Sequence, residues 1–159
     1  MVKPRDLRPA LEALLDEIGL APCDMRGLLI QDVGDLAGTF AKIIGGDCVD
    51  VRLERIEHNA CWKFHRDVVK TRLITTYHGP TTEWVQMAQA EQAIREQTLF
   101  AGPLERLGDH HVAIFKGNRS GPTNGIVHRS PPIEGTGQTR LMLCLNQRSD
   151  VSPDLWTGA

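Results

Sequence analysis

Residues 72–80, Arg-Leu-Ile-Thr-Thr-Tyr-His-Gly-Pro, join a run that favours β-structure to a turn signal, and they set the fold class that we predict. β-Branched and aromatic residues favour strands, whereas Gly-Pro ends them. Similar short runs recur on both sides, bounded by glycine, proline and polar residues. These further predicted strands are 49–56, 83–87, 111–115, 125–128 and 140–145. Several short strands separated by turns favour a β-sandwich or barrel over a βαβ sheet.

Two amphipathic helices are predicted before the first strand. Leucine and isoleucine recur at helical spacing from Leu7 to Ile18, and Gly19 offers a stop. The second helix is predicted over Asp32–Ile44, with Gly45 at its end. The chain is therefore expected to be mainly β with N-terminal helices.

We expect a single domain over residues 1–159. It comprises a helical N-terminal buttress (1–46), a β-core (47–146) and a polar tail (147–159). Within the core, the Ala-, Gln- and Glu-rich stretch 88–97 is either a helix or a loop insertion.

Composition excludes several classes of protein. Of the 159 residues, 41% are hydrophobic, and 18 basic against 20 acidic residues give a net charge of −2, so no basic surplus is present to neutralise phosphates. No apolar run approaches the roughly 18 residues that cross a bilayer, and no signal-peptide core follows the charged N-terminus. The four cysteines include no C-x-x-C pair, which argues against a disulfide framework or a zinc ribbon. We expect a soluble, cytoplasmic protein with neither a nucleic-acid nor a membrane partner.

The densest chemistry lies in residues 58–67, His-Asn-Ala-Cys-Trp-Lys-Phe-His-Arg-Asp, which end in the motif His65-x-Asp67. In a strand, residues i and i+2 project from the same face, so this imidazole and carboxylate would converge. His128, at the end of the predicted strand 125–128, is the candidate third ligand. Two histidines and one carboxylate form a facial triad that leaves positions open for substrate and oxygen. H-x-D also occurs by chance, and a surface pair is its alternative.

Arg140 opens the predicted strand 140–145, twelve residues after His128. A guanidinium at the start of a buried strand needs an anion, because leaving it unpaired is costly. A bidentate clamp on the far carboxylate of a dicarboxylate meets that need, and an internal salt bridge to Glu83 or Asp109 is the alternative. Glu83 and Arg72 are expected to form a cross-strand pair.

The order of these motifs resembles the 2-oxoglutarate/Fe(II)-dependent dioxygenase superfamily, in particular its prolyl-hydroxylase-like branch. The resemblance is carried by residues 65–67, 72–77, 79–84 (Gly-Pro-Thr-Thr-Glu-Trp), 108–109 and 128–135 (His-Arg-Ser-Pro-Pro-Ile-Glu-Gly), with Arg140 following. A closer resemblance is to DUF1826, a bacterial family of unknown function. It is carried by residues 61–67, 75–84, 116–117 and 127–132 and extends from about residue 47 to 145. Thr81 departs from an expected glycine, and Arg129-Ser130 replace small residues, which points to a remodelled cosubstrate pocket.

The superfamily resemblance implies a double-stranded β-helix, the jelly-roll or cupin-like fold. It also implies Fe(II) held by His65, Asp67 and His128, with 2-oxoglutarate bound through Arg140. Tyr77, the only tyrosine, and Thr75 on the same strand face are candidates to assist Arg140. For Tyr77 the alternative is a half-buried aromatic residue, and strand threonines are common without a role. The implied activity is hydroxylation of an unknown small substrate.

A second hypothesis is a non-catalytic protein of the same fold that binds a divalent metal such as zinc and takes part in metal handling. Cys61, four residues before His65, motivates it because thiolate and imidazole together suit zinc. A buried structural cysteine is the alternative for Cys61. A third hypothesis is a decayed site on a barrel used for partner contact. The short chain predicts either a small-molecule substrate or a pocket completed by a second copy in a homodimer.

Overall fold

The structure is a computed structural model that describes residues 1–121 and 125–158. The chain divides into two compact units, one formed by Met1–Val51 with Leu145–Ala159 and the other by Arg52–Cys144. Ala159, the last residue of the predicted tail, lies outside the described residues. Among the described residues, none of the helices has the length and apolar character to cross a membrane. The assignment of all 159 residues to a single domain stays a prediction.

The first unit contains the two predicted helices. A short 3-10 helix, η1 (Pro4–Asp6), leads into α1 (Leu7–Glu17), and α2 spans Asp24–Ile44. Both helices end where glycine was predicted to end them, since Gly19 and Gly45 adopt left-handed backbone angles, with φ of 76° and 62°.

Helix α2 begins eight residues before the predicted start at Asp32. The Cys23 thiol caps it by accepting a hydrogen bond from the Arg26 backbone nitrogen at 3.4 Å. The buried Arg26 side chain donates to the carbonyl of Glu12 at 3.0 Å and pairs with Asp16 at 2.7 Å. Tertiary contacts of one arginine therefore fix a helix start that periodicity does not reveal.

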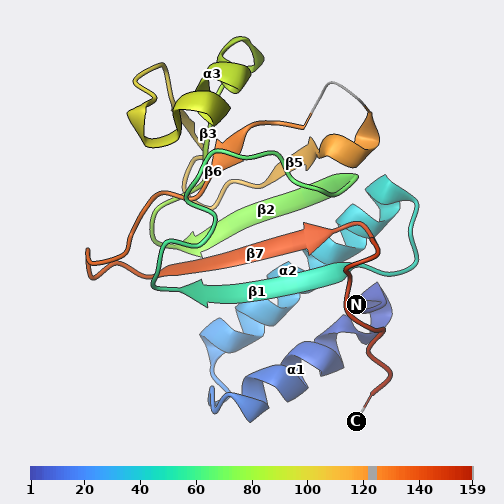
Figure 1. Cartoon of the computed structure of the whole chain (residues 1–159). Helices are drawn as coiled ribbons and strands as arrows, with labels where there is room; N and C mark the ends of the chain where they lie inside the picture. Colours follow the sequence, from blue (N-terminus) through green and yellow to red (C-terminus); the bar gives the residue numbers. More distant parts are fainter. Residues whose placement is uncertain (122–124, 159) are drawn as a thin grey trace. The chain divides into compact units, whose positions relative to one another are not determined.

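The two ends of the chain lie side by side in this unit (Figure 1). The Met1 amino group donates to the Asp154 carbonyl at 2.8 Å, and the Trp156 backbone nitrogen donates to the Met1 carbonyl at 2.7 Å. Val2 forms an antiparallel bridge with Val49. The two hydrogen bonds of Asp154 and Trp156 hold the polar tail against the N-terminal segment.

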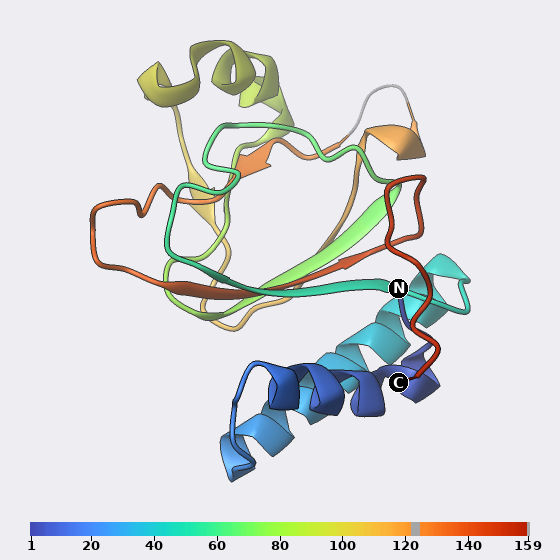
Figure 2. The same cartoon turned by 60° about the horizontal axis from the view of Figure 1, so that its bottom comes forward.

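The described residues form two antiparallel sheets, and no barrel is formed (Figure 1). The four-stranded sheet has the order β1-β7-β2-β5, and the three-stranded sheet has the order β4-β3-β6. Viewed along its edge, the three-stranded sheet lies across from the four-stranded one (Figure 2). The strands are β1 (Asp50–Ile56), β2 (Thr71–His78), β3 (Glu83–Trp84), β4 (Glu105–Arg106), β5 (Ala113–Lys116), β6 (His128–Arg129) and β7 (Arg140–Asn146).

The strand predictions hold in part. Strands β2 and β7 match their predicted runs closely, whereas β3 is shorter than 83–87 and β4 was not predicted. His128 is the first residue of β6 and not the last residue of a strand over 125–128, because the residues of β6 that pair with β3 are His128 and Arg129.

A backbone bridge between His65 and His128 adds a further segment beside β6. We number the strands together with the His65 segment from 1 to 8 along the chain, so that β1 is segment 1, the His65 segment is 2, and β2 to β7 are 3 to 8. The order is then 1-8-3-6 in one sheet and 2-7-4-5 in the other. Every pair of neighbouring segments thus joins one of segments 1–4 to one of segments 5–8.

The stretch predicted as a helix or a loop insertion is helical. It forms η2 (Met87–Gln89), α3 (Ala90–Glu96) and η3 (Gln97–Leu99), and a further 3-10 turn, η4, spans Asn118–Ser120. Residues of α3 share a core cluster with segments that precede the two candidate histidine ligands. This cluster contains Phe64, Val85, Ala90, Ala93 and Val127, with Ile94, Phe100 and Leu104 packed against it.

Candidate metal centre

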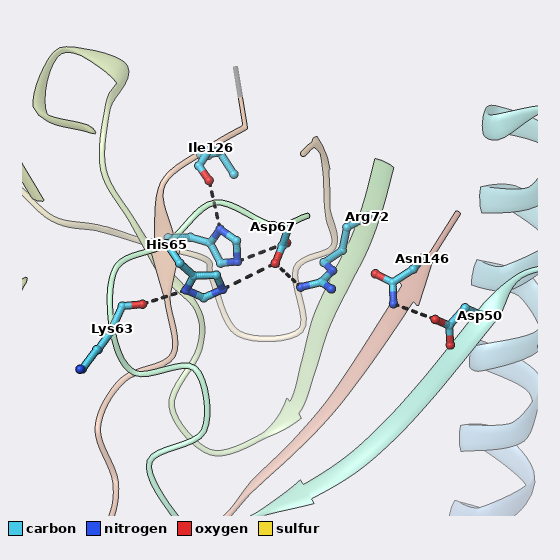
Figure 3. Close-up of polar contacts among 8 residues, drawn as sticks. Asp50, Lys63, His65, Asp67, Arg72, Ile126 and Asn146 are labelled. Atoms are coloured by element: carbon cyan, nitrogen blue, oxygen red, sulfur yellow. Dashed lines mark hydrogen bonds and ion pairs between the residues drawn. The ribbon is translucent and has the colours of Figure 1, made fainter. Parts of the chain in front are cut away.

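His65, Asp67 and His128 lie together, and each offers a ligand atom within 4.8 Å of the others. Nε2 of His65 is 3.5 Å from Oδ1 of Asp67, and Nε2 of His128 is 3.5 Å from Oδ2 of the same carboxylate (Figure 3). The two imidazole rings are 4.6 Å apart between centroids. The structure therefore brings together the three residues that the sequence marked as candidate ligands.

Backbone pairing explains how two histidines so distant in sequence meet. The His65 nitrogen donates to the His128 carbonyl at 3.0 Å, and the His128 nitrogen donates to the His65 carbonyl at 3.1 Å. The Gln97 side chain holds the preceding residue, because its oxygen accepts from the Phe64 nitrogen at 2.8 Å and its amide donates to the Phe64 carbonyl at 2.9 Å. Gln97 was not predicted to have a role, since a side chain that imitates a strand partner leaves no periodic signal.

Asp67 is held by close backbone packing against Gly117. The Asn118 nitrogen donates to the Asp67 carbonyl at 2.9 Å. A Cβ on Gly117 would lie 2.7 Å from the Asp67 carbonyl oxygen and 2.3 Å from that of Val69. The Lys116-Gly117 motif thus has a physical reason, since only glycine allows this approach.

Both imidazoles are oriented by backbone carbonyls. Nδ1 of His65 is 2.8 Å from the carbonyl of Lys63, and Nδ1 of His128 is 3.2 Å from that of Ile126. A carbonyl only accepts, so in each neutral ring Nδ1 carries the proton and Nε2 has a free lone pair. Both lone pairs then face the oxygens of Asp67. Acceptors gathered in this way need a proton or a cation among them.

Charges around the carboxylate keep it ionised. Nη1 of Arg72 lies 2.5 Å from Oδ1 of Asp67. Burial by itself would raise the pKa of Asp67, but the hydrogen bond with His65 and the positive charges of His128 and Arg72 lower this pKa below its ordinary value. Oδ2 is buried and has no hydrogen-bond partner. One oxygen of an ionised carboxylate therefore stands ready for a ligand.

The pKa values of the two histidines are shifted in opposite directions. The hydrogen bond with Asp67 raises the pKa of His65, because it favours the protonated ring. Burial lowers the pKa of His128 to about 4. His128 is consequently neutral at pH 7, which is the protonation state of a metal ligand.

These donors fit a divalent metal ion. Two imidazole nitrogens and a carboxylate suit Fe(II) and Zn(II). Two atoms that each lie about 2.1 Å from a shared ion are at most about 4.2 Å apart. Both Nε2 to Oδ distances in the cluster, 3.5 Å each, fall inside that limit.

Arg140 is completely buried, with none of its surface exposed. Its Nε donates to the Pro80 carbonyl at 2.7 Å and its Nη2 contacts the Met142 sulfur at 3.5 Å, but its Nη1 has no partner. Burial lowers the pKa of this guanidinium. The turn that supplies the Pro80 carbonyl needs Gly79, because φ there is 81° and a Cβ would lie 2.1 Å from the Thr139 oxygen.

The alternative of an internal salt bridge for Arg140 is wrong for the described residues. Both oxygens of the buried Glu83 carboxylate are taken, one by Arg106 at 2.7 Å and the other by Arg129 at 2.8 Å. Asp109 likewise forms no ion pair with Arg140 in this part of the chain. The expected pairing of Glu83 with Arg72 is also wrong, since Arg72 instead contacts Asp67. The position of Arg72 at the start of a strand, five residues after Asp67, is the signal that sequence reasoning missed.

The structure does not bring Thr75 and Tyr77 to this cluster. Arg72 reaches Asp67, and Ile74 lines a cavity together with His128, so both project from one face of β2. Successive side chains of a strand alternate between faces, which places Thr75 and Tyr77 on the opposite one. Thr76 shares the face of Arg72, and its hydroxyl is buried without a hydrogen-bond partner.

Cys61 is neither buried nor part of the cluster. Its side chain is exposed, its φ is 53°, and the candidate metal group comprises only His65, Asp67 and His128 among the described residues. The expectation of a buried structural cysteine is therefore wrong. The four cysteines all lie among the described residues, and none of them forms a disulfide there.

Two facing antiparallel sheets define a β-rich protein, and the cluster of half-buried His65 with buried Asp67 and His128 gives it a candidate divalent-metal centre. The chain belongs to the family described as "Protein of unknown function (DUF1826)", whose model matches residues 1–146. The match confirms the family predicted from the motifs and extends it over the N-terminal helices. A search of curated proteins finds none that matches this chain.

Proposed function

We propose that this protein is an Fe(II)- and 2-oxoglutarate-dependent dioxygenase-like enzyme that hydroxylates a small substrate. The observation that carries the proposal is the cluster of His65, Asp67 and His128, in which two oriented Nε2 atoms and an unpartnered carboxylate oxygen face one another. This donor set matches the facial triad of non-haem Fe(II) oxygenases.

The strand order supports a double-stranded β-helix as the scaffold. Segments 1 and 8, 2 and 7, 3 and 6, and 4 and 5 are neighbours, and successive pairs alternate between the two sheets. Such an order results when one long hairpin of eight segments is rolled into two facing sheets, as in a jelly roll. In this arrangement the second and seventh segments carry the two histidines.

Each residue of the centre has a defined part in the proposed enzyme. His65, Asp67 and His128 would hold the iron, while the carbonyls of Lys63 and Ile126 accept from Nδ1 and so leave Nε2 of each neutral ring as the nitrogen that binds the metal. Arg72 keeps Asp67 ionised and oriented. When bound, Fe(II) and 2-oxoglutarate would activate oxygen, which supplies the oxidising power for hydroxylation of a C–H bond while 2-oxoglutarate is oxidised to succinate and carbon dioxide.

Arg140 supports 2-oxoglutarate as the cosubstrate. A fully buried guanidinium with an unpartnered Nη1 is costly unless an anion pairs with it. The far carboxylate of 2-oxoglutarate would supply that anion with bidentate geometry.

The second candidate, a non-catalytic zinc protein, uses the same three ligands. Its motivation was a Cys61 thiolate beside the histidines, but Cys61 is exposed and outside the cluster. The oxygenase is therefore the function that we favour.

The test is 2-oxoglutarate turnover by protein purified and loaded with Fe(II) under anaerobic conditions. After addition of oxygen, we expect succinate from the wild type and from His111→Ala, a control at an exposed histidine outside the cluster. His65→Ala should abolish it. Absence of succinate under conditions in which a reference 2-oxoglutarate oxygenase, assayed separately, forms it would refute the proposal.

A further inference from the structure

A cavity of about 240 Å³ lies between the two sheets of the second unit. Its walls include Ile74, Ala113 and Phe115 from the four-stranded sheet and Trp84 and His128 from the three-stranded sheet, with Thr82 beside them. His128 is also a candidate metal ligand, so the cavity adjoins the metal centre.

The cavity is built for an uncharged molecule. Thr82 and His128 are its polar lining residues, Trp84 adds an indole, and no lysine, arginine, aspartate or glutamate lines it among the described residues. Arg140 is not part of its wall. A dicarboxylate would therefore have no counter-charge there.

Thr82 supplies one unsatisfied polar group. The residue is only 5% exposed, and its hydroxyl has no hydrogen-bond partner. The neighbouring Thr81 hydroxyl, in contrast, donates to the Leu107 carbonyl at 2.5 Å. Buried hydroxyls are normally paired, and an unpaired one points to a missing partner. A ligand with one hydrogen-bonding atom would satisfy it.

We propose that this cavity binds the substrate, and that the substrate is an uncharged, mainly apolar molecule with one oxygen or nitrogen atom that pairs with Thr82. The assignment of this molecule as the substrate rests on the proposed function. An apolar cavity of about 150 Å³ holds benzene. The cavity here, at about 240 Å³, has room for a six-membered ring with a few additional atoms.

Two probes of the same shape test the proposal. Cyclohexanone carries one acceptor oxygen, and methylenecyclohexane replaces it by a CH2 group. Each probe is titrated into the full-length protein, and backbone amide shifts and the Trp84 indole signal are followed by NMR. We expect both probes to shift the signals of the lining residues, with cyclohexanone bound more tightly. If neither probe shifts these signals, the proposal is overturned.

Variants separate the hydroxyl from the shape of the cavity. Thr82→Val should weaken cyclohexanone binding about fivefold, the effect of one hydrogen bond of about 1 kcal/mol, and leave methylenecyclohexane unchanged. Thr82→Ser should still bind cyclohexanone more tightly than methylenecyclohexane. Thr81→Val should do so too, because the Thr81 hydroxyl of the wild type donates to the Leu107 carbonyl. Ala113→Phe should block both probes. Equal cyclohexanone binding by Thr82→Val and the wild type would overturn the role of Thr82.

Metal titrations on the same proteins distinguish the two proposals. Thr82→Val should bind Mn(II) as the wild type does, whereas His65→Ala should lose Mn(II) and keep the probes. A wild type that binds Mn(II) but neither probe refutes the assignment of the cavity. Absence of metal binding in a wild type that holds the probes refutes the proposed function.

Discussion

Gly117→Ala should disturb the metal centre from a position outside it. The new Cβ would lie 2.3 Å from the Val69 carbonyl oxygen and 2.7 Å from that of Asp67. Both atoms are backbone, so the loop has to shift. Forcing extra volume into a packed site costs about 1–3 kcal/mol, and displacing a ligand's support typically weakens metal binding about 10–100-fold. We therefore expect a loss of about 2 kcal/mol in the free energy of unfolding.

The assay is urea unfolding together with a Mn(II) titration of the folded protein. Gly38→Ala is the matched control, because a Cβ there meets no atom within 4 Å inside helix α2. It should stabilise the protein by up to about 1 kcal/mol and leave metal affinity unchanged. Wild-type stability and Mn(II) affinity in Gly117→Ala would refute the argument that backbone packing holds Asp67.

Three further predictions follow from the charges of the centre. In the metal-free protein, the lowered pKa of His128 gives stability that is present above pH 6.5 and is lost as the pH falls toward 4, by about 3 kcal/mol in all. The raised pKa of His65 gives stability that is present below pH 6.5 and is lost at higher pH, so urea unfolding across pH should show a maximum near 6.5, and a monotonic curve would contradict this. Arg140→Met should keep or raise the free energy of unfolding, because it removes an unpaired buried group, while 2-oxoglutarate binding measured by calorimetry falls at least about tenfold. Zn(II) at a hundred times its Kd should raise the free energy of unfolding by about 2.7 kcal/mol in the wild type and not in His65→Ala.

Periodic elements could be predicted from the sequence. Helix α1 shows clear helical spacing, strand β2 is rich in β-branched and aromatic residues, and Gly45 marks the end of α2 by its conformational freedom. Strands β3, β4 and β6 have two residues each, too few for a period to be visible. Their boundaries depend on long-range pairing, such as that of His65 with His128.

The candidate ligands could be predicted because residue type and order carry their chemistry. What surrounds them could not, since Arg72, Gln97 and Gly117 act through tertiary contacts that have no local signature. Thr75 and Tyr77 show what the alternation of side chains along a strand cannot predict. Their shared face follows from the sequence, but which face points toward the histidines depends on how the strand is placed.

The most direct measurement is a crystal structure of the protein grown with Mn(II) under anaerobic conditions, with anomalous data collected at the manganese edge. The proposed metal centre predicts one strong peak bonded to Nε2 of His65, Nε2 of His128 and the carboxylate of Asp67, at about 2.0–2.3 Å from each. An anomalous map with no peak among these three residues, or with the ion bound elsewhere on the chain, would contradict it.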